Sequence, residues 1–418
     1  MTQHKSPVKN WLFWLSVVSC TLYQSYRYPL QIGSSGTSPT YADTPFALQA
    51  GKFIFALPVL AIALTRSLTK PLRSFQWIVI LAVLFLCGYS VFKILGDTDP
   101  AIFESSFWML FSLISVLAID RVSISSIDKY LKFLLIFSFL STLIEVTLFF
   151  TVGRLPALAY EGTLSVRFGG FLDDPNGFAL ICFLLMGWSF YRFKARTRFL
   201  ILTGQVLLLV LTQSWTAIGF FLLFLLVWAV LALLKRPAVG IPVVCLMGAC
   251  VVFLLTKLSA TLIPVLLNLL SSKQDSVQDH VAPLAEFLAG WSEWILLGTA
   301  SYNHFESWWL GAVINYGVLW LGVDIFVVAA LFVSLVQASS RATPQARPIF
   351  VGLIFGGLYF VLGSFNLPFP LVFPLNVLFF VFSFLVFFDK LEDDGPTDRQ
   401  LANPSITGPL FPRRSYDF

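Results

Sequence analysis

Long apolar runs separated by short polar segments recur along almost the whole chain. An α-helix needs about 17 to 25 apolar residues to cross the roughly 30 Å hydrocarbon core of a bilayer. The pattern predicts twelve transmembrane helices, at about 10–26, 46–65, 75–95, 103–119, 130–151, 176–192, 199–213, 215–234, 240–260, 307–335, 349–365 and 371–388. We therefore expect an all-α polytopic membrane protein in which residues 1–388 form a single transmembrane domain.

Composition agrees with this class, because 57% of the 418 residues are hydrophobic and only 12% are charged, against about 25% charged in soluble proteins. The basic amino-terminal residues precede an apolar run without a clear small-residue cleavage site, so we expect a retained first helix. The cysteines all lie in apolar runs without metal-ligand spacing, and we interpret them as small apolar side chains. They are Cys20, Cys87, Cys182, Cys245 and Cys250.

The distribution of Lys and Arg predicts the orientation, because short cytoplasmic loops retain basic residues. With both termini in the cytoplasm, 20 of the 27 basic residues fall on the inner side. The basic residues then form a cytoplasmic ring that contacts anionic lipid headgroups. This arrangement accounts for the net charge of +5, so nucleic acid is not expected as a partner. Three long segments fall outside, at about 27–45, 152–175 and 261–306, and the Pro-containing polar tail 389–418 is expected to be a disordered cytoplasmic end.

The first candidate site is the polar segment RFGGFLDDPNGFA, which begins at Arg167 and separates two apolar runs. A guanidinium at a membrane boundary suits a phosphate group, and Arg154 supplies a second cation upstream. Gly169 and Gly170 would let the backbone approach a bulky anion, and Asp173 is a candidate partner for Arg167. Asp174-Pro175-Asn176 has the pattern of a helix N-cap followed by proline at the first helical position. We expect the substrate to lie along Gly169, Gly170, Asp173 and Asn176 of this motif and Tyr302 of the second motif.

The second candidate site, GTASYNHFESWWLGAVINYG, ends the largest outer segment and leads into the helix expected from about Ser307. His304 or Glu306 could act as a general base with a pKa close to ambient pH, and Tyr302 lies beside them. Trp308 and Trp309 are expected to belong to an interfacial aromatic belt. Upstream, His280 follows Ser276 by four residues in a stretch that looks amphipathic.

These two motifs resemble those of the O-antigen polymerase and O-antigen ligase superfamily (Wzy/WaaL-like), over roughly Gly51 to Phe388. The resemblance implies a GT-C-like helical fold with a large helical periplasmic loop, in the bacterial inner membrane. It implies inverting transfer from an undecaprenyl-pyrophosphate-linked oligosaccharide at the periplasmic face, with Arg167 holding the pyrophosphate and His304 or Glu306 as the base. His280 stands where the family has its second arginine, so Lys273 or Arg154 would substitute for it.

We favour a polymerase of polysaccharide repeat units, for O-antigen, capsule or exopolysaccharide, with no cofactor and no obligatory metal. Its partners would be the lipid-linked donor and acceptor, membrane lipids and a chain-length regulator protein. One alternative is an O-antigen ligase that transfers glycan to lipid A core. Others are a twelve-span transporter or flippase and a purely structural membrane protein. Glu145 and Asp324 are the chief ionisable residues inside predicted spans, which is fewer than a transporter would usually need.

Overall fold

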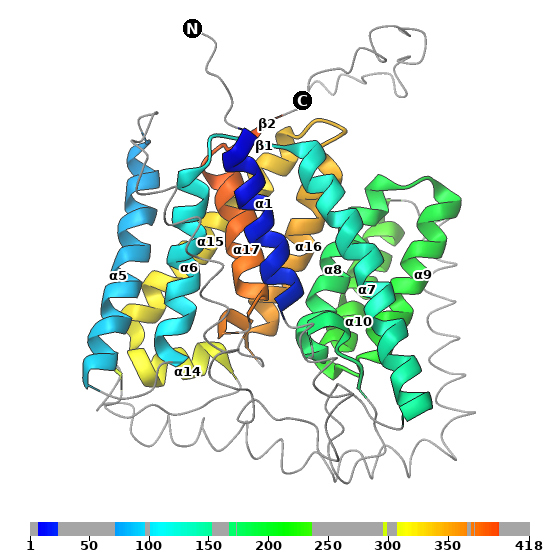
Figure 1. Ribbon diagram of the computed structural model, residues 1–418, viewed down its shortest axis with the longest axis horizontal. Coiled ribbons are helices and arrows are strands. Elements are labelled where there is room, and N and C mark those ends of the chain that lie inside the picture. Colours follow the sequence, from blue (N-terminus) through cyan, green and yellow to red (C-terminus); the bar gives the residue numbers. More distant parts are fainter. Residues whose placement is uncertain are drawn as a thin grey trace, which may run out of the picture.

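The computed structural model describes residues 7–23, 72–96, 101–152, 167–172, 174–235, 296–298, 307–365, 369–371 and 373–392. Nearly all of this part is helical (Figure 1). Its α-helices are α1 (Pro7–Leu22), α5 (Ser74–Gly96), α6 (Ala101–Ala118), α7 (Ile124–Val152), α8 (Pro175–Arg192), α9 (Ala195–Leu211), α10 (Trp215–Lys235), α14 (Trp308–Tyr316), α15 (Val318–Arg341), α16 (Arg347–Gly363) and α17 (Leu375–Phe387). Two short 3₁₀ helices, η3 (Gly170–Leu172) and η4 (Phe369–Leu371), and two strands, β1 (Val122–Ser123) and β2 (Leu391–Glu392), complete it.

The prediction of a helical, membrane-type fold is supported at the level of class. Ten of the twelve predicted segments contain a described helix, and 46–65 and 240–260 lie outside the described residues. Three helical stretches are long and apolar enough to cross a membrane, namely Ser74–Lys93, Ile124–Thr151 and Val318–Arg341. Several other apolar helices are shorter. The architecture is therefore all-helical and fits a membrane protein.

The helix expected over 307–335 is wrong as a single element, because it is divided at Gly317. Gly317 has φ +88°, and a Cβ there would collide with the carbonyl oxygen of Leu296. Gly298 has φ +72° and meets the carbonyl of Asn315 in the same way, while the Tyr89 hydroxyl donates to Leu297 O at 2.7 Å. The turn 296–298 thus fits against the junction, and α14 ends there before α15 begins.

Helices α8 and α16 pack extensively against each other and contact through small residues. A Cβ on Gly352 would lie 2.8 Å from Leu184 O and 2.9 Å from Trp188 Cβ. On the facing helix, a Cβ on Gly187 would lie 2.9 Å from Val351 O. Glycines allow this approach because they have no side chain between the two backbones. Close backbone packing of this kind is one of the interactions that hold helices together in lipid.

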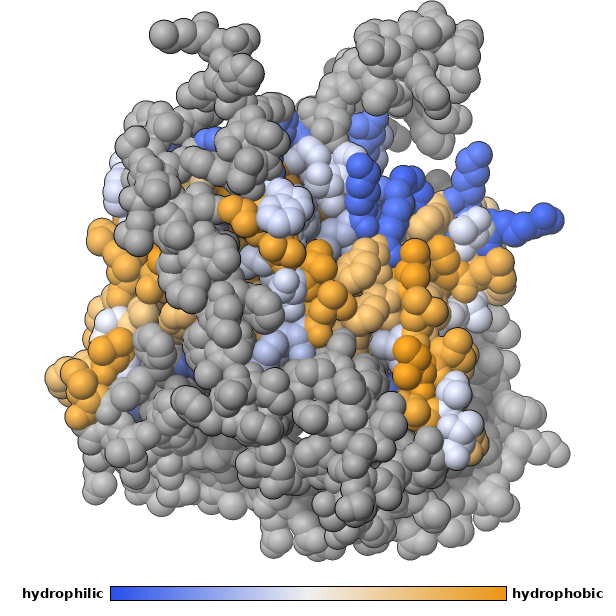
Figure 2. All heavy atoms as spheres, in the orientation of Figure 1, coloured by the Kyte–Doolittle hydropathy of each residue, from blue (hydrophilic) through white to orange (hydrophobic). Residues whose placement is uncertain are grey.

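One end of the bundle, which we call the basic end, carries Arg73, Arg121, Lys132, Arg192 and Lys390. There β1 pairs in parallel with β2, and Arg73 Nη2 lies 2.9 Å from Asp389 Oδ2. Asp128 receives Arg192 Nε at 2.8 Å and Lys132 Nζ at 2.6 Å. Figure 2 shows hydrophilic side chains gathered at this end above an apolar band.

The basic end brings distant parts of the chain together. α1 begins there, and β2 lies there too (Figure 1). The sequence predicts a disordered tail over 389–418, but the first residues of that segment are ordered and include β2. Residues 393–418 of the segment lie outside the described residues.

Candidate functional site

Arg167 lies at the end of the bundle opposite the basic end, between the start of α8 and the end of α9. Its Nε donates to Thr212 O at 3.1 Å, and its Nη2 donates to Asn176 Oδ1 at 2.9 Å. The backbone of the next residue, Phe168, is held by a hydrogen bond from its N–H to Leu211 O at 3.1 Å. The arginine and Arg192 therefore lie at opposite ends of α8, roughly 24 Å apart along the helix axis at 1.5 Å per residue.

Arg167 forms no ion pair with an acidic residue in the described part of the chain. A guanidinium has five N–H donors, and its bonds to described groups use two of them. Asp173, the expected partner, lies outside the described residues. Within the described part, the positive charge of this half-buried side chain is thus not compensated by a contacting carboxylate.

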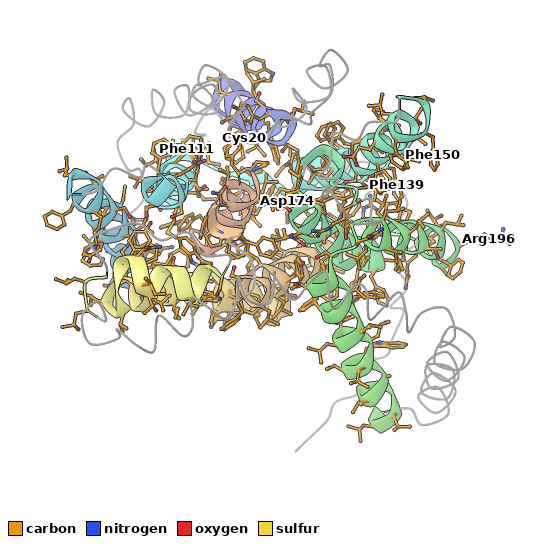
Figure 3. All side chains as sticks on the ribbon, turned by 90° about the horizontal axis from the view of Figure 1, so that it is seen from below. Cys20, Phe111, Phe139, Phe150, Asp174 and Arg196 are labelled. Carbon is orange, nitrogen blue, oxygen red and sulfur yellow. The ribbon has the colours of Figure 1, made fainter. Side chains whose placement is uncertain are left out.

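Asp174 is the N-cap of α8, as the Asp-Pro-Asn pattern predicted. Its two carboxylate oxygens accept from Asn176 N at 3.0 Å and Gly177 N at 3.1 Å, and Pro175 occupies the first helical position. Burial raises the pKa of the Asp174 carboxyl above its ordinary value, although those two N–H groups and the charge of Arg167 act in the opposite direction. Figure 3 views the bundle from this end and shows Asp174 near its centre, with Arg196 at the periphery.

The glycine pair does not form an open cradle for an anion. The carboxylate of Glu145, from α7, accepts from Gly170 N at 2.8 Å and also interacts with the N–H of Gly169. Both glycines are buried, and Gly170 has φ +58° with the Phe178 ring against the place of a Cβ. The pair instead allows the segment after Arg167 to turn tightly over α7, where an internal carboxylate occupies its amides.

Asn176 and Ser214 complete the surroundings of Arg167. Ser214 Oγ donates to Asn176 Oδ1 at 2.7 Å, so the same oxygen accepts from Arg167 and from Ser214. The Tyr359 hydroxyl of α16 is buried and lies beside Ser214, without a hydrogen bond of good geometry to a described group. This cluster joins α8, α16, the α9–α10 turn and the segment before η3.

The residues of the second motif that were expected to be catalytic, His304 and Glu306, lie outside the described residues. So do Tyr302, His280, Lys273 and Arg154. The described flank of the motif is anchored: Ser307 Oγ caps α14 by accepting from Leu310 N at 3.4 Å. The backbone of the next residue, Trp308, donates to Ser364 O at 3.1 Å.

Trp308 is not part of an interfacial belt, contrary to expectation. Its side chain is only 4% exposed, and its indole donates to Asp324 Oδ2 at 3.2 Å. Trp309 is half-buried and donates to Val361 O at 3.3 Å. Asp324, 2% exposed, therefore has a structural partner inside the bundle.

Other chemistry expected from the sequence can be located in the described part. Cys20, Cys87 and Cys182 are free and buried, as predicted for apolar fillers, whereas Cys245 and Cys250 lie outside the described residues. The described residues contain no group of three or more His, Cys, Asp or Glu side chains that could hold a metal ion.

Sequence reasoning missed the parts that Ser214 and Tyr359 play and noted Glu145 only as an ionisable residue inside a span. Ser214 carried a usable signal, because it breaks an apolar run at the same end of the predicted bundle as Arg167. Tyr359 carried none, since one tyrosine in an apolar helix does not reveal its neighbours. No protein-family model matches the chain, and no curated protein matches it.

Proposed function

We propose that the protein is a polymerase of polysaccharide repeat units, an inverting glycosyltransferase of the bacterial inner membrane. Twelve spans with both termini in the cytoplasm and a GT-C-like arrangement would place Arg167 at the periplasmic face. The donor is a glycan linked to undecaprenyl pyrophosphate, and the acceptor is a second lipid-linked repeat unit.

The observation that best supports this proposal is the state of Arg167. It is held by a backbone carbonyl and an amide oxygen and not by a carboxylate of the described part. An arginine near hydrocarbon that is held only by neutral groups keeps its charge available for an anionic ligand. The leaving group of a polyprenyl-diphosphate donor is such an anion, and it gains charge as the sugar departs.

The reaction requires one displacement at the anomeric carbon. The acceptor hydroxyl oxygen attacks that carbon while the bond to the diphosphate oxygen breaks, and the anomeric configuration inverts. His304 or Glu306 takes the hydroxyl proton. Arg167, with Arg154 as the second cation, stabilises the negative charge that develops on the departing diphosphate. The leaving group is already activated, so the proposed chemistry needs no obligatory metal.

The direct test is Arg167→Ala in cells that make the polysaccharide, with Arg196→Ala as the matched control. Arg196 is an exposed arginine of α9 near the basic end, so its removal should leave chain length unchanged. Loss of one preorganised donor to developing charge lowers turnover by about 10²- to 10³-fold, and we expect single repeat units to accumulate on the carrier. Polymer of normal length from Arg167→Ala would overturn the proposal.

The accumulating glycans also separate the rival functions. A missing polymerase leaves single repeat units on the carrier at the periplasmic face. A missing ligase leaves long lipid-linked polymer that is not transferred to lipid A core, whereas a missing flippase leaves repeat units on the cytoplasmic face. His304→Ala and Glu306→Ala, compared in the same assay, identify the base.

A further inference from the structure

The hydrogen bonds around Asn176 fix the orientation of its side-chain amide. Oδ1 accepts from Arg167 Nη2 at 2.9 Å and from Ser214 Oγ at 2.7 Å. The Arg167 guanidinium can only donate, so the amide atom that it contacts is the oxygen, because an amide nitrogen could not accept that bond. The Nδ2 group therefore points away from both donors, and in the described part of the chain its two N–H bonds have no acceptor.

Two neighbouring side chains at this end of the bundle have N–H groups that described groups leave unused. Arg167 contributes three N–H bonds that described groups leave unpaired, and Asn176 contributes two. The nearby carboxylate of Asp174 is turned toward the start of α8, where both oxygens accept backbone N–H groups. Both donor-bearing side chains are half-buried, which leaves part of each accessible to a ligand.

A buried group beneath the cluster also lacks a partner. Tyr359 is 0% exposed. Its hydroxyl lies beside Ser214 and close to Arg167, without a hydrogen bond of good geometry to a described group. Buried polar groups are normally paired.

We propose that Asn176 is a ligand-binding residue for a diphosphate: Arg167 binds one phosphate group, and the Nδ2 of Asn176 donates to the other. The inference rests on the proposed function and specifies how its donor is recognised. Arg167 Nη2 lies 2.9 Å from Asn176 Oδ1, so the remaining guanidinium N–H groups and the Nδ2 of the same amide are close enough to contact adjacent phosphates of one ligand. A monophosphate occupies the guanidinium alone, so the amide confers preference for the diphosphate.

The experiment measures binding of farnesyl diphosphate and farnesyl monophosphate to purified protein in detergent, by calorimetry. Inorganic pyrophosphate and phosphatidylglycerol serve as further probes, to separate recognition of a lipid diphosphate from binding of free phosphate or of ordinary anionic lipid. The variants are Asn176→Ala, Asn176→Asp and Arg167→Ala. Thr197→Asp adds a matched negative charge at an exposed position near the basic end.

Asn176→Ala should weaken diphosphate binding about 10- to 100-fold, the usual effect of losing a hydrogen bond to a charged group. Its monophosphate affinity should change far less, so the preference for diphosphate disappears. Asn176→Asp keeps both acceptor contacts, and the fold with them. It should lose affinity for both probes, because its carboxylate neutralises Arg167, and Thr197→Asp should bind as the wild type does.

The two proposals fail in different ways. If Asn176→Ala weakens both probes equally, Asn176 only positions Arg167 and the inference is wrong, while the proposed function stands. Unchanged diphosphate binding in Asn176→Ala also overturns the inference. Equal binding of farnesyl diphosphate by wild type and Arg167→Ala would show that the proposed donor site is wrong. Tighter binding of pyrophosphate or phosphatidylglycerol than of farnesyl diphosphate would show the same. In either case the inference about Asn176 is wrong too.

Discussion

Gly352 on α16 offers a quantitative test of the helix pair that carries the candidate site. A Cβ at this position would lie 2.8 Å from Leu184 O, 2.9 Å from Trp188 Cβ and 3.1 Å from Trp188 N. Carbon atoms prefer separations of about 3.5 to 4.0 Å, so the helices must separate by several tenths of an ångström. Overpacking of this kind costs about 1–3 kcal/mol, while alanine recovers up to about 1 kcal/mol of helix preference over glycine.

The net expectation is that Gly352→Ala lowers the free energy of unfolding by about 0–2 kcal/mol, and that Gly352→Leu lowers it further. Gly219 of α10 is the matched control, because a Cβ there meets nothing within 4 Å. Gly219→Ala should therefore stabilise the helix by about 0.5–1 kcal/mol. The assay is equilibrium unfolding in mixed detergent micelles, with the four proteins compared at one detergent composition.

The same variants test whether the packing of α8 against α16 supports the proposed diphosphate site at Arg167 and Asn176. Asn176 lies in the first turn of α8 and Tyr359 lies on α16, so separating the two helices should also weaken binding of a diphosphate probe in proportion to the loss of stability. Unfolding of Gly352→Leu at the wild-type denaturant concentration would contradict the close contact at Gly352. So would a Gly219→Ala protein that is destabilised as much as Gly352→Ala.

Three further predictions follow from the described contacts. Asp174→Ala should cost about 1 kcal/mol of unfolding free energy through loss of the α8 cap, while Asp174→Asn should cost little because Asn caps equally well; equal losses would contradict the capping role. Gly317→Ala should cost on the order of 3 kcal/mol, because φ +88° strains any residue with a Cβ, and a thermal midpoint equal to that of wild type would exclude this. Thr197→Cys in a cysteine-free background should react with a membrane-impermeant maleimide only in inside-out vesicles; labelling of intact spheroplasts would reverse the proposed orientation.

The sequence allowed the helical class to be predicted because the apolar runs are long and their ends are marked by polar residues. It also identified the start of α8, since Asp174 and Pro175 determine that start locally through a cap and a fixed φ. Features of this kind depend on residues within one turn of each other. They can be predicted without knowledge of the tertiary structure.

The features that were missed depend on contacts between distant residues. The break at Gly317 lies in an apolar run that looks continuous, and it exists because the turn at Leu296 packs against it. The glycine pair after Arg167 was assigned to a ligand, but Glu145 from α7 reaches its amides. Neither pairing leaves a mark in the local hydrophobic pattern. The small-residue contact at Gly352 did carry a signal, because Gly352 and Gly356 have the four-residue spacing of a close helix contact.

The parallel pairing of β1 with β2 constrains the order in which the molecule can be assembled during synthesis. Lys390 Nζ binds Ile119 O across a separation of 271 residues, and neither it nor the strand pair can form before the ribosome has translated past α17. At roughly 5–20 residues per second, translation of that interval takes about 15–55 s. The segment between α6 and α7 therefore lacks these contacts during that time. A chain truncated before Asp389 would never form the β1–β2 pairing or the Lys390–Ile119 hydrogen bond.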